Sequence, residues 1–237
     1  MGAIYFHIPF CKQICSYCDF YRTAALKALP AVVEQMCEEV KERANYLTDK
    51  QIRTIYFGGG TPSTLTIGEL RRILENIFHL STFKACTSER NASLLAISQR
   101  AQPSINEVNF QLEEITLEAN PDDLTEEYVK ELRTLPINRV SIGIQTFNDT
   151  RLRWARRRHT AEQAVTAVKR LRAHGISNIS IDLMFGFPSH TLTEWQHDLQ
   201  QAINLKPEHI SAYSLTVEEG TPLMSLCEKG TECATED

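Results

Sequence analysis

The segment that decides the class of this chain is His7-Ile8-Pro9-Phe10-Cys11-Lys12-Gln13-Ile14-Cys15-Ser16-Tyr17-Cys18-Asp19-Phe20. It starts at the end of a strand-like run and carries three cysteines in the spacing C-x3-C-x2-C. Three thiolates on one short loop can bind three irons of a [4Fe–4S] cluster, which leaves the fourth iron open to a small molecule. Zinc usually takes four ligands, and no fourth cysteine or histidine follows at a finger-like distance. The alternative interpretation is that the three cysteines are structural or incidental and bind no metal.

The composition narrows the class of protein further. The chain has 237 residues, 42% of them hydrophobic, which suits one large globular domain or two small ones. A net charge of −5 argues against a nucleic-acid partner, and no apolar run is long enough for a transmembrane segment. Strand-like sequence from Ala3 leaves no room for a leader peptide, and seven cysteines with one dense group fit a reducing compartment. We therefore expect a cytoplasmic protein.

Short β-branched runs alternate with longer amphipathic stretches along the chain. The expected strands are 3–8, 53–57, 114–118, 139–144, 178–184 and 209–216, and the expected helices are 30–47, 67–80, 126–135, 161–174 and 192–205. Capping boxes mark three helix starts, namely Thr66 with Glu69, Thr160 with Gln163 and Thr191 with Glu194.

This repetition of strand and helix predicts an α/β fold with a parallel sheet and helices outside. About six units are present where a closed barrel has eight, so we expect an incomplete (β/α)6 TIM-like barrel with its site at the carboxyl ends of the strands. The expected domain spans residues 1–222 with a polar insertion at 81–112, followed by a short divergent tail at 223–237.

Polar residues stand at the predicted ends of several strands. The second strand runs into Gly58-Gly59-Gly60-Thr61-Pro62, where glycines allow close approach of the backbone to a ligand. Glu118, Gln145 and Asp182 each interrupt apolar strand sequence near its end. Structural hydrogen bonding would explain any one of them. Their shared position, on the same edge as the cysteines, favours a common polar ligand.

As a set, these motifs resemble the radical S-adenosylmethionine (SAM) superfamily. The resemblance is strongest to the oxygen-independent coproporphyrinogen III oxidase family and, within it, to the HemW-like radical SAM heme chaperones. Residues 7–20, 56–62, 116–121, 141–148 and 182–188 carry it. The likeness covers residues 4–222 apart from the insertion. It fades where family members continue into a C-terminal domain, so the C-terminal part of the family pattern is missing.

The resemblance implies two cofactors, a [4Fe–4S] cluster and SAM, and a one-electron cleavage of SAM that yields a 5′-deoxyadenosyl radical. It assigns the cluster to Cys11, Cys15 and Cys18. It assigns SAM contacts to Tyr5, Tyr17, Gly59, Gly60, Thr61, Glu118, Gln145, Arg157, Asp182 and Thr216. Within that set Arg157 would pair with the methionine carboxylate, and Glu118 would bind a ribose hydroxyl or the ammonium. No residue receives a catalytic role.

One position separates the two functions known in this family. The oxidases carry a fourth cysteine two places beyond the third, where this chain has Phe20. Cys18-Asp19-Phe20 resembles the chaperone group, so we expect a protein that binds heme and transfers it to an acceptor. Oxidative decarboxylation of coproporphyrinogen III is the alternative, and a truncated inactive remnant is another. Whether the chain acts as an enzyme stays open.

The resemblance also suggests partners. These are heme or a porphyrin, an unknown heme-acceptor protein, and an electron donor of the flavodoxin or ferredoxin type. His7 is a candidate heme ligand, because neutral imidazole suits iron. The competing interpretation, which we favour, is a strand histidine with a local hydrogen bond.

Overall fold

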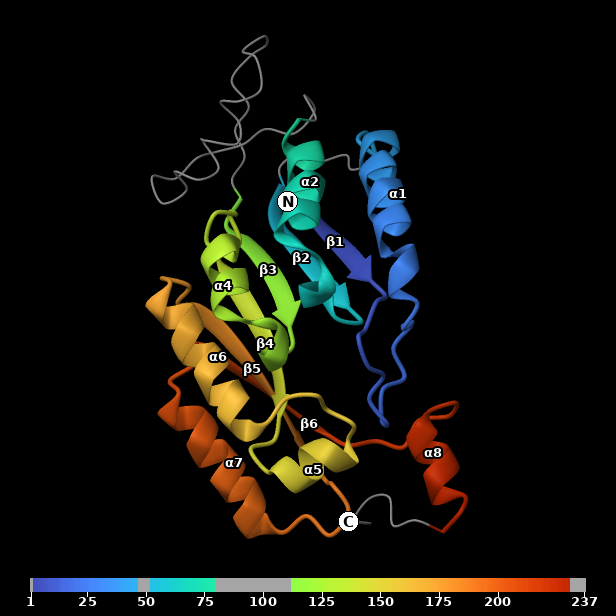
Figure 1. The fold of residues 1–237 in the computed structure, drawn as a ribbon, viewed down its shortest axis with the longest axis vertical. Helices are drawn as coiled ribbons and strands as arrows, with labels where there is room; N and C mark the ends of the chain where they lie inside the picture. Colours follow the sequence, from blue (N-terminus) through green and yellow to red (C-terminus); the bar gives the residue numbers. More distant parts are fainter. Residues whose placement is uncertain (1, 47–51, 80–111, 231–237) are drawn as a thin grey trace.

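The computed structural model describes residues 2–46, 52–79 and 112–230 (Figure 1). Its centre is a six-stranded parallel sheet in the order β1-β2-β3-β4-β5-β6, so β1 and β6 form the two edges. The strands are β1 (Gly2–Ile8), β2 (Ile52–Gly59), β3 (Glu114–Ala119), β4 (Arg139–Gln145), β5 (Asn178–Phe185) and β6 (His209–Ser214). The expected incomplete parallel barrel is confirmed.

The helices follow the strands in alternation. They are α1 (Leu29–Glu42), α2 (Ile67–Phe78), α4 (Glu126–Leu132), α5 (Asp149–Trp154), α6 (Ala161–Ala173), α7 (Leu192–Asn204) and α8 (Pro222–Cys227). Contacts of α2 with α1 and α4, and of α4 with α6, join these helices into one layer beside the sheet (Figure 1). All three predicted capping boxes are present, and each satisfies backbone N–H groups at its helix start.

Residues alternate between the two faces of the sheet. The face under the helices is apolar and fully buried; it includes Ile55, Phe57, Ile115, Leu117, Val140, Ile142, Ile179 and Ile181. The opposite, inner face carries polar side chains, among them Tyr56, Glu118, Ser141 and Asp182. Since side chains in a strand alternate with a period of two, one apolar set anchors the helices while the polar set lines the inside of the barrel.

Two short helices, α5 and α8, were not predicted, because six residues are too few for a helical period to appear. The first helix ends at Glu42, before the expected residue 47, and passes into a turn. The last strand ends at Ser214, before the expected residue 216, and the next residue, Leu215, is buried in a separate apolar cluster. The expected insertion at 81–112 lies outside the described residues except for Leu112, as does the tail beyond residue 230.

That separate cluster, here called the second core, consists of Ala155, Met184, Phe187, Leu215 and Leu223. Tyr17, which lies between two of the motif cysteines, packs against it. The backbone N–H of Leu223 also donates to the carbonyl of Ser16 at 2.8 Å. The start of α8 therefore packs directly against the cysteine segment. Within the described ranges no helix has the length and apolar character that crossing a bilayer requires.

Candidate functional site

The three motif cysteines lie on a loop that leaves the carboxyl end of β1; residues 9–23 are called the cysteine loop. Two backbone hydrogen bonds close its base, from Cys11 N to Thr23 O at 2.9 Å and from Thr23 N to Pro9 O at 2.6 Å. At its tip, Ser16 N donates to Ala155 O at 3.2 Å. The turn after α5 thus supports the part of the loop between Cys15 and Cys18.

The thiols of Cys11, Cys15 and Cys18 are free and line one cavity of about 380 Å³. Burial raises the pKa of Cys11 and of Cys18, and the Thr61 hydroxyl donates to Cys11 Sγ at 3.3 Å. Among the described residues, no three His, Cys, Asp or Glu side chains converge on a single metal ion. In a [4Fe–4S] cluster each thiolate binds a different iron, so convergence on one point is not needed. The donor set and the cavity fit such a cluster.

The glycine motif brings the end of β2 against the cysteine loop. Gly59 has φ +109°, and a Cβ there would lie 2.7 Å from the His7 ring. A Cβ at Gly60 would lie 2.9 Å from Ile8 O and 3.0 Å from Cys11 Sγ. Only glycine accepts both the backbone angle at the first position and the close approach at the second. These two residues leave room for a ligand beside the first cysteine.

Two carboxyl groups line the cavity, Glu118 from β3 and Asp182 from β5. Glu118 accepts hydrogen bonds from Tyr56 Oη at 2.7 Å and Gly59 N at 3.1 Å, and burial raises its pKa. Asp182 accepts from Ser141 Oγ at 3.3 Å, and burial raises its pKa as well. A ligand with an ammonium or hydroxyl groups would supply the donors that stabilise both ionised carboxylates.

Arg157 brings a partly buried guanidinium beside the thiols. Its Nη1 donates to Cys15 Sγ at 3.5 Å, and its Nη2 donates to Asn120 Oδ1 at 2.6 Å and to the Gly143 carbonyl. Its Nε is buried without a hydrogen-bond partner. An incompletely paired guanidinium lining a cavity is suited to bind a carboxylate.

Most of the predicted residues meet at this cavity. Its lining includes Cys11, Cys15, Cys18, Tyr17, Gly59, Gly60, Thr61, Glu118, Gln145, Arg157 and Asp182. It also includes residues to which the sequence argument had assigned no role in the site, among them Asn120, Ser141, Gly143, Ser211 and Tyr213. The first three fall inside motif segments already quoted. Tyr213 donates to the Gln145 side chain, but it lies outside the motif segments, and no feature of the sequence around it marked it as a site residue.

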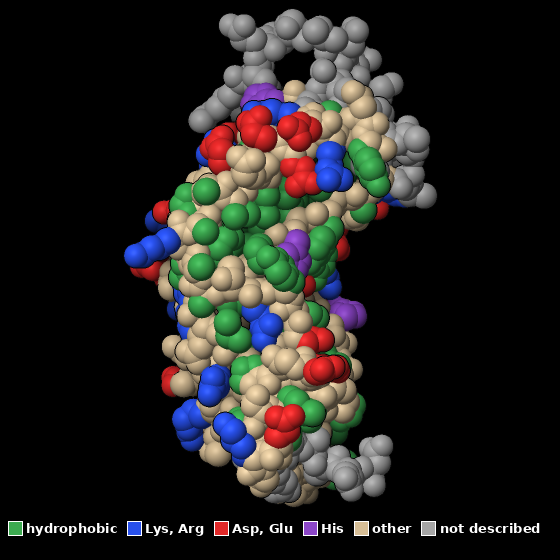
Figure 2. Space-filling view, turned by 90° about the vertical axis from the view of Figure 1, so that its right-hand side faces the viewer, with side chains coloured by type: hydrophobic (Ala, Val, Ile, Leu, Met, Phe, Trp, Pro, Cys, Tyr) green, Lys and Arg blue, Asp and Glu red, His purple; other side chains and the backbone are tan. Residues whose placement is uncertain are grey.

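Three predicted residues do not line the cavity. Thr216 is exposed and lies beyond the end of β6. Tyr5 is 57% exposed; with His7 it borders a separate groove of about 450 Å³ between β1 and α1. Hydrophobic side chains gather over the middle of the face that carries β1 and α1 (Figure 2). Tyr5 stacks on Tyr56, whose hydroxyl binds Glu118, so it lies behind the cavity lining rather than in it.

Both ring nitrogens of His7 have partners within the protein. Nε2 lies 3.0 Å from the Tyr21 carbonyl and therefore carries the proton, while Nδ1 lies 3.2 Å from Tyr5 Oη and accepts from it. This arrangement matches the strand histidine with local hydrogen bonds. Ligation of heme iron by His7 would require one of these bonds to break.

Comparison with known proteins identifies the family. The model of the radical SAM superfamily matches residues 5–202, which span the second half of β1, the cysteine loop and β2 to β5. The chain belongs to the radical SAM superfamily. Membership in the radical SAM superfamily implies a [4Fe–4S] cluster and SAM, and the thiols, guanidinium and carboxyl groups around the cavity fit both.

Several curated relatives of this radical SAM protein carry one name. The chain is similar to the heme chaperone HemW of Lactococcus lactis, with 36% identity over 97% of this chain and 53% of the relative. It is similar to HemW of Bacillus subtilis, with 34% identity over 97% of this chain and 54% of the relative. The chain thus spans about half the length of these relatives. Among solved structures, the coproporphyrinogen III oxidase HemN from Escherichia coli shares the fold, with a TM-score of 0.69, 23% identity, and coverage of 90% of this chain and 44% of that chain.

Proposed function

We propose that this chain binds a [4Fe–4S] cluster through Cys11, Cys15 and Cys18 and binds SAM in the adjacent cavity. The observation that carries the proposal is the shared lining: three free thiols and the Arg157 guanidinium face the same cavity of about 380 Å³. Three cysteines leave one iron of a cluster without a protein ligand, and that iron is available to SAM.

The charged and polar residues of the cavity would each bind a different group of SAM. Arg157 would pair with the methionine carboxylate, because its Nη groups lie beside Cys15 and its Nε is unpaired. Glu118 would accept from the ammonium or a ribose hydroxyl, and Gln145 and Asp182 would add polar contacts. Gly59, Gly60 and Thr61 would leave space at the methionine end, and the partly buried Tyr17 would lie near the adenine. A reduced cluster, when bound, supplies the electron that cleaves SAM.

We further propose that the chain serves as a radical SAM heme chaperone, which takes up heme and passes it to an acceptor protein. Curated relatives named heme chaperone HemW, 31–36% identical over most of this chain, support this. So does Phe20, which stands where the oxidases of the family have a fourth cysteine and is 62% exposed. A flavodoxin- or ferredoxin-type donor would reduce the cluster. A [4Fe–4S] cluster is bound by thiolates, so Cys11, Cys15 and Cys18 must stay reduced, which supports a cytoplasmic location.

The test starts with anaerobic reconstitution using iron and sulfide. Heme is then titrated into the cluster-loaded protein, and its transfer to an apo heme protein is followed by absorbance. A parallel sample receives SAM, reductant and coproporphyrinogen III, and products are identified by mass spectrometry. Heme uptake and transfer without decarboxylation is the expected result. Decarboxylated product would establish the oxidase alternative, and cluster-loaded protein with neither property would contradict both.

A further inference from the structure

A buried carboxyl group outside the cavity connects the loops that form the site. Asp123, in the single turn of 3₁₀ helix after β3 (Pro121–Asp123), is 4% exposed. It accepts from Lys12 Nζ at 2.6 Å, from Ser63 Oγ at 2.8 Å and from Arg158 Nη2 at 3.1 Å. These donors come from the cysteine loop, from the turn after the glycine motif, and from the residue beside Arg157.

Each donor is close in the chain to a group that lines the cavity. Lys12 follows Cys11 directly, and Ser63 comes two residues after Thr61, whose hydroxyl donates to Cys11. Hydrogen bonds also connect Ser63 to the guanidinium of Arg157 through Asn120. Asn120 N donates to Ser63 Oγ at 3.1 Å, and Asn120 Oδ1 accepts from Arg157 at 2.6 Å.

The energetics favour a role in geometry over a role in bulk stability. A buried carboxylate is costly unless it is paired and hydrogen-bonded, and three donors satisfy this one. Even so, a buried ion pair often adds little net stability, because desolvation offsets the attraction. What such a group does supply is a fixed arrangement of its partners, and the partners of Asp123 belong to three different loops.

We propose that Asp123 is a positioning residue for the cofactor site. Through Lys12, Ser63 and Arg158 it fixes the cysteine loop and Arg157 relative to each other, so that the thiols and the guanidinium face one cavity. The inference rests on the cluster-binding part of the proposed function. It adds a residue that contacts neither cofactor but controls how well both are held.

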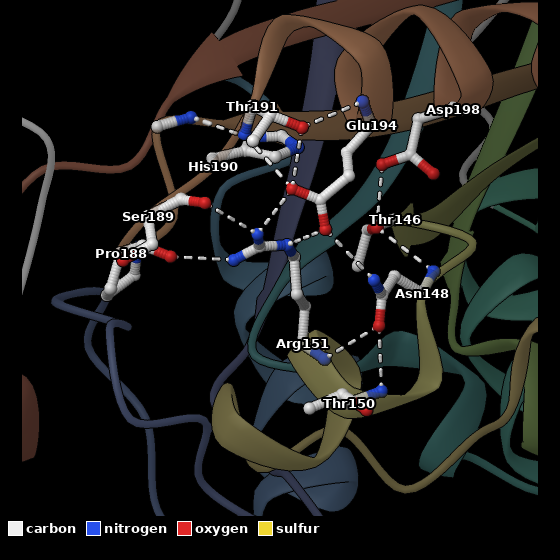
Figure 3. A network of polar contacts seen from close by, with 11 residues as sticks. Thr146, Asn148, Thr150, Arg151, Pro188, Ser189, His190, Thr191, Glu194 and Asp198 are labelled. Atoms are coloured by element: carbon white, nitrogen blue, oxygen red, sulfur yellow. Dashed lines mark hydrogen bonds and ion pairs between the residues drawn. The ribbon is translucent and has the colours of Figure 1, made fainter.

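The structure offers a matched control, Asp198 on α7. Asp198 is 2% exposed and accepts from Thr146 Oγ1 at 2.6 Å (Figure 3). It also accepts from Phe147 N at 2.8 Å. It does not line the cavity, and its two donors follow Gln145 in the chain rather than belonging to the cysteine loop. Asp123→Asn and Asp198→Asn therefore both remove a buried negative charge, but only the first removes it from donors on the cysteine loop and beside Arg157.

Both variants are reconstituted anaerobically, and three quantities are measured: the rate of iron release to a chelator, the SAM dissociation constant and the urea unfolding midpoint. We expect Asp123→Asn to release iron about tenfold faster and to bind SAM about tenfold more weakly than Asp198→Asn, with similar unfolding midpoints. Lys12→Gln, at a half-exposed donor, should reproduce part of this effect and add nothing further to Asp123→Asn. It serves as the test if Asp123→Asn fails to fold.

Equal iron release and SAM binding in the two aspartate variants would overturn the inference, since Asp123 would then be an ordinary buried acid. A cofactor-free measurement separates this outcome from failure of the proposed function. In the apo protein, alkylation rates of Cys15 and Cys18 should change in Asp123→Asn and not in Asp198→Asn. If the natural sequence takes up no cluster, the proposed function is wrong, and the alkylation rates still decide whether Asp123 positions the loop.

Discussion

Residues of the same type differ in whether they line the cavity. Cys11, Cys15 and Cys18 share a cavity, whereas Cys37 is buried in the hydrophobic core on α1. The same contrast holds for two arginines on and after α5. Arg157, after the helix, is in contact with Cys15 and Asn120, while Arg153, on the helix, is exposed and donates to Thr150. These differences give matched pairs of substitutions.

Cys15→Ala should abolish formation of the [4Fe–4S] cluster, because two thiolates cannot hold three of its irons. Iron and sulfide content and the broad visible absorbance after reconstitution are the measurements. Cys37→Ala is the control; it removes a buried thiol from the core and should leave cluster content unchanged despite a small loss of stability. A full cluster in Cys15→Ala would refute the assignment of the three ligands.

Arg157→Ala should weaken SAM binding about 10- to 100-fold, the loss expected when a charged, bidentate partner of a carboxylate is removed (about 1.4–2.7 kcal/mol). Calorimetric titration of SAM into the cluster-loaded protein measures this. Arg153→Ala, an exposed arginine on the same segment, should bind SAM as the natural sequence does. Unchanged affinity in Arg157→Ala would exclude its carboxylate role.

Among the elements, α5 is held in place by α7 and by the loop after β5. Arg151 on α5 forms a two-point ion pair with Glu194 on α7, with Nη2 to Oε2 at 2.7 Å and Nε to Oε1 at 3.3 Å (Figure 3). Arg151 also donates to the carbonyls of Pro188 and Ser189 at 2.8 Å and 3.2 Å. The far end of α5 supports the tip of the cysteine loop, so this ion pair links α7 to the site.

Arg151→Ala should lower the free energy of unfolding by about 1–3 kcal/mol, because it removes the charged partner of Glu194 and a donor to the carbonyls of Pro188 and Ser189. Urea denaturation provides the measurement. Arg153→Ala on the same helix should change it by less than about 0.5 kcal/mol. If the two variants are equally stable, the network in Figure 3 does not hold α5.

The stability of the whole molecule should depend on pH through His159. Its Nε2 donates to the Ile144 carbonyl at 3.1 Å, and its Nδ1 is buried without a partner. Burial and the nearby Arg157 lower the pKa of His159 to about 3. In the unfolded chain it is about 6.5. Between these values only the unfolded chain binds the proton, so stability falls as the pH drops below about 6.5 and does not depend on this residue above it.

Between about pH 7 and about pH 5 we expect His159 to account for a loss of about 2 kcal/mol in the free energy of unfolding. Hydrogen bonds from Arg151 hold the pKa of Glu194 at about 2, so that carboxyl does not titrate in this range. His159→Gln keeps a donor for Ile144 but cannot titrate, and it should show a smaller loss. Equal losses in both proteins would contradict the prediction.

Elements with a long hydrophobic period were predictable from the sequence to within a few residues. The helix expected at 161–174 is Ala161–Ala173, and the strand expected at 178–184 is Asn178–Phe185. The six-residue helices α5 and α8 were not, because isolated helices of this length are unstable and depend on tertiary contacts. In α8 that contact is Leu223, which is fully buried in the second core.

The sequence by itself determined the parallel α/β fold, the three-cysteine motif and the glycines beside it, because each depends on local spacing or backbone angle. Only the tertiary structure decided which distant groups meet. Arg157 reaches Cys15 across 142 residues, and Lys12 reaches Asp123 across 111. Tyr5 and Thr216, placed by motif alone, lie outside the cavity lining. The physical reason is that the local hydrophobic period determines which face of a strand or helix is buried. The packing of whole elements against one another determines which side chains reach the cavity.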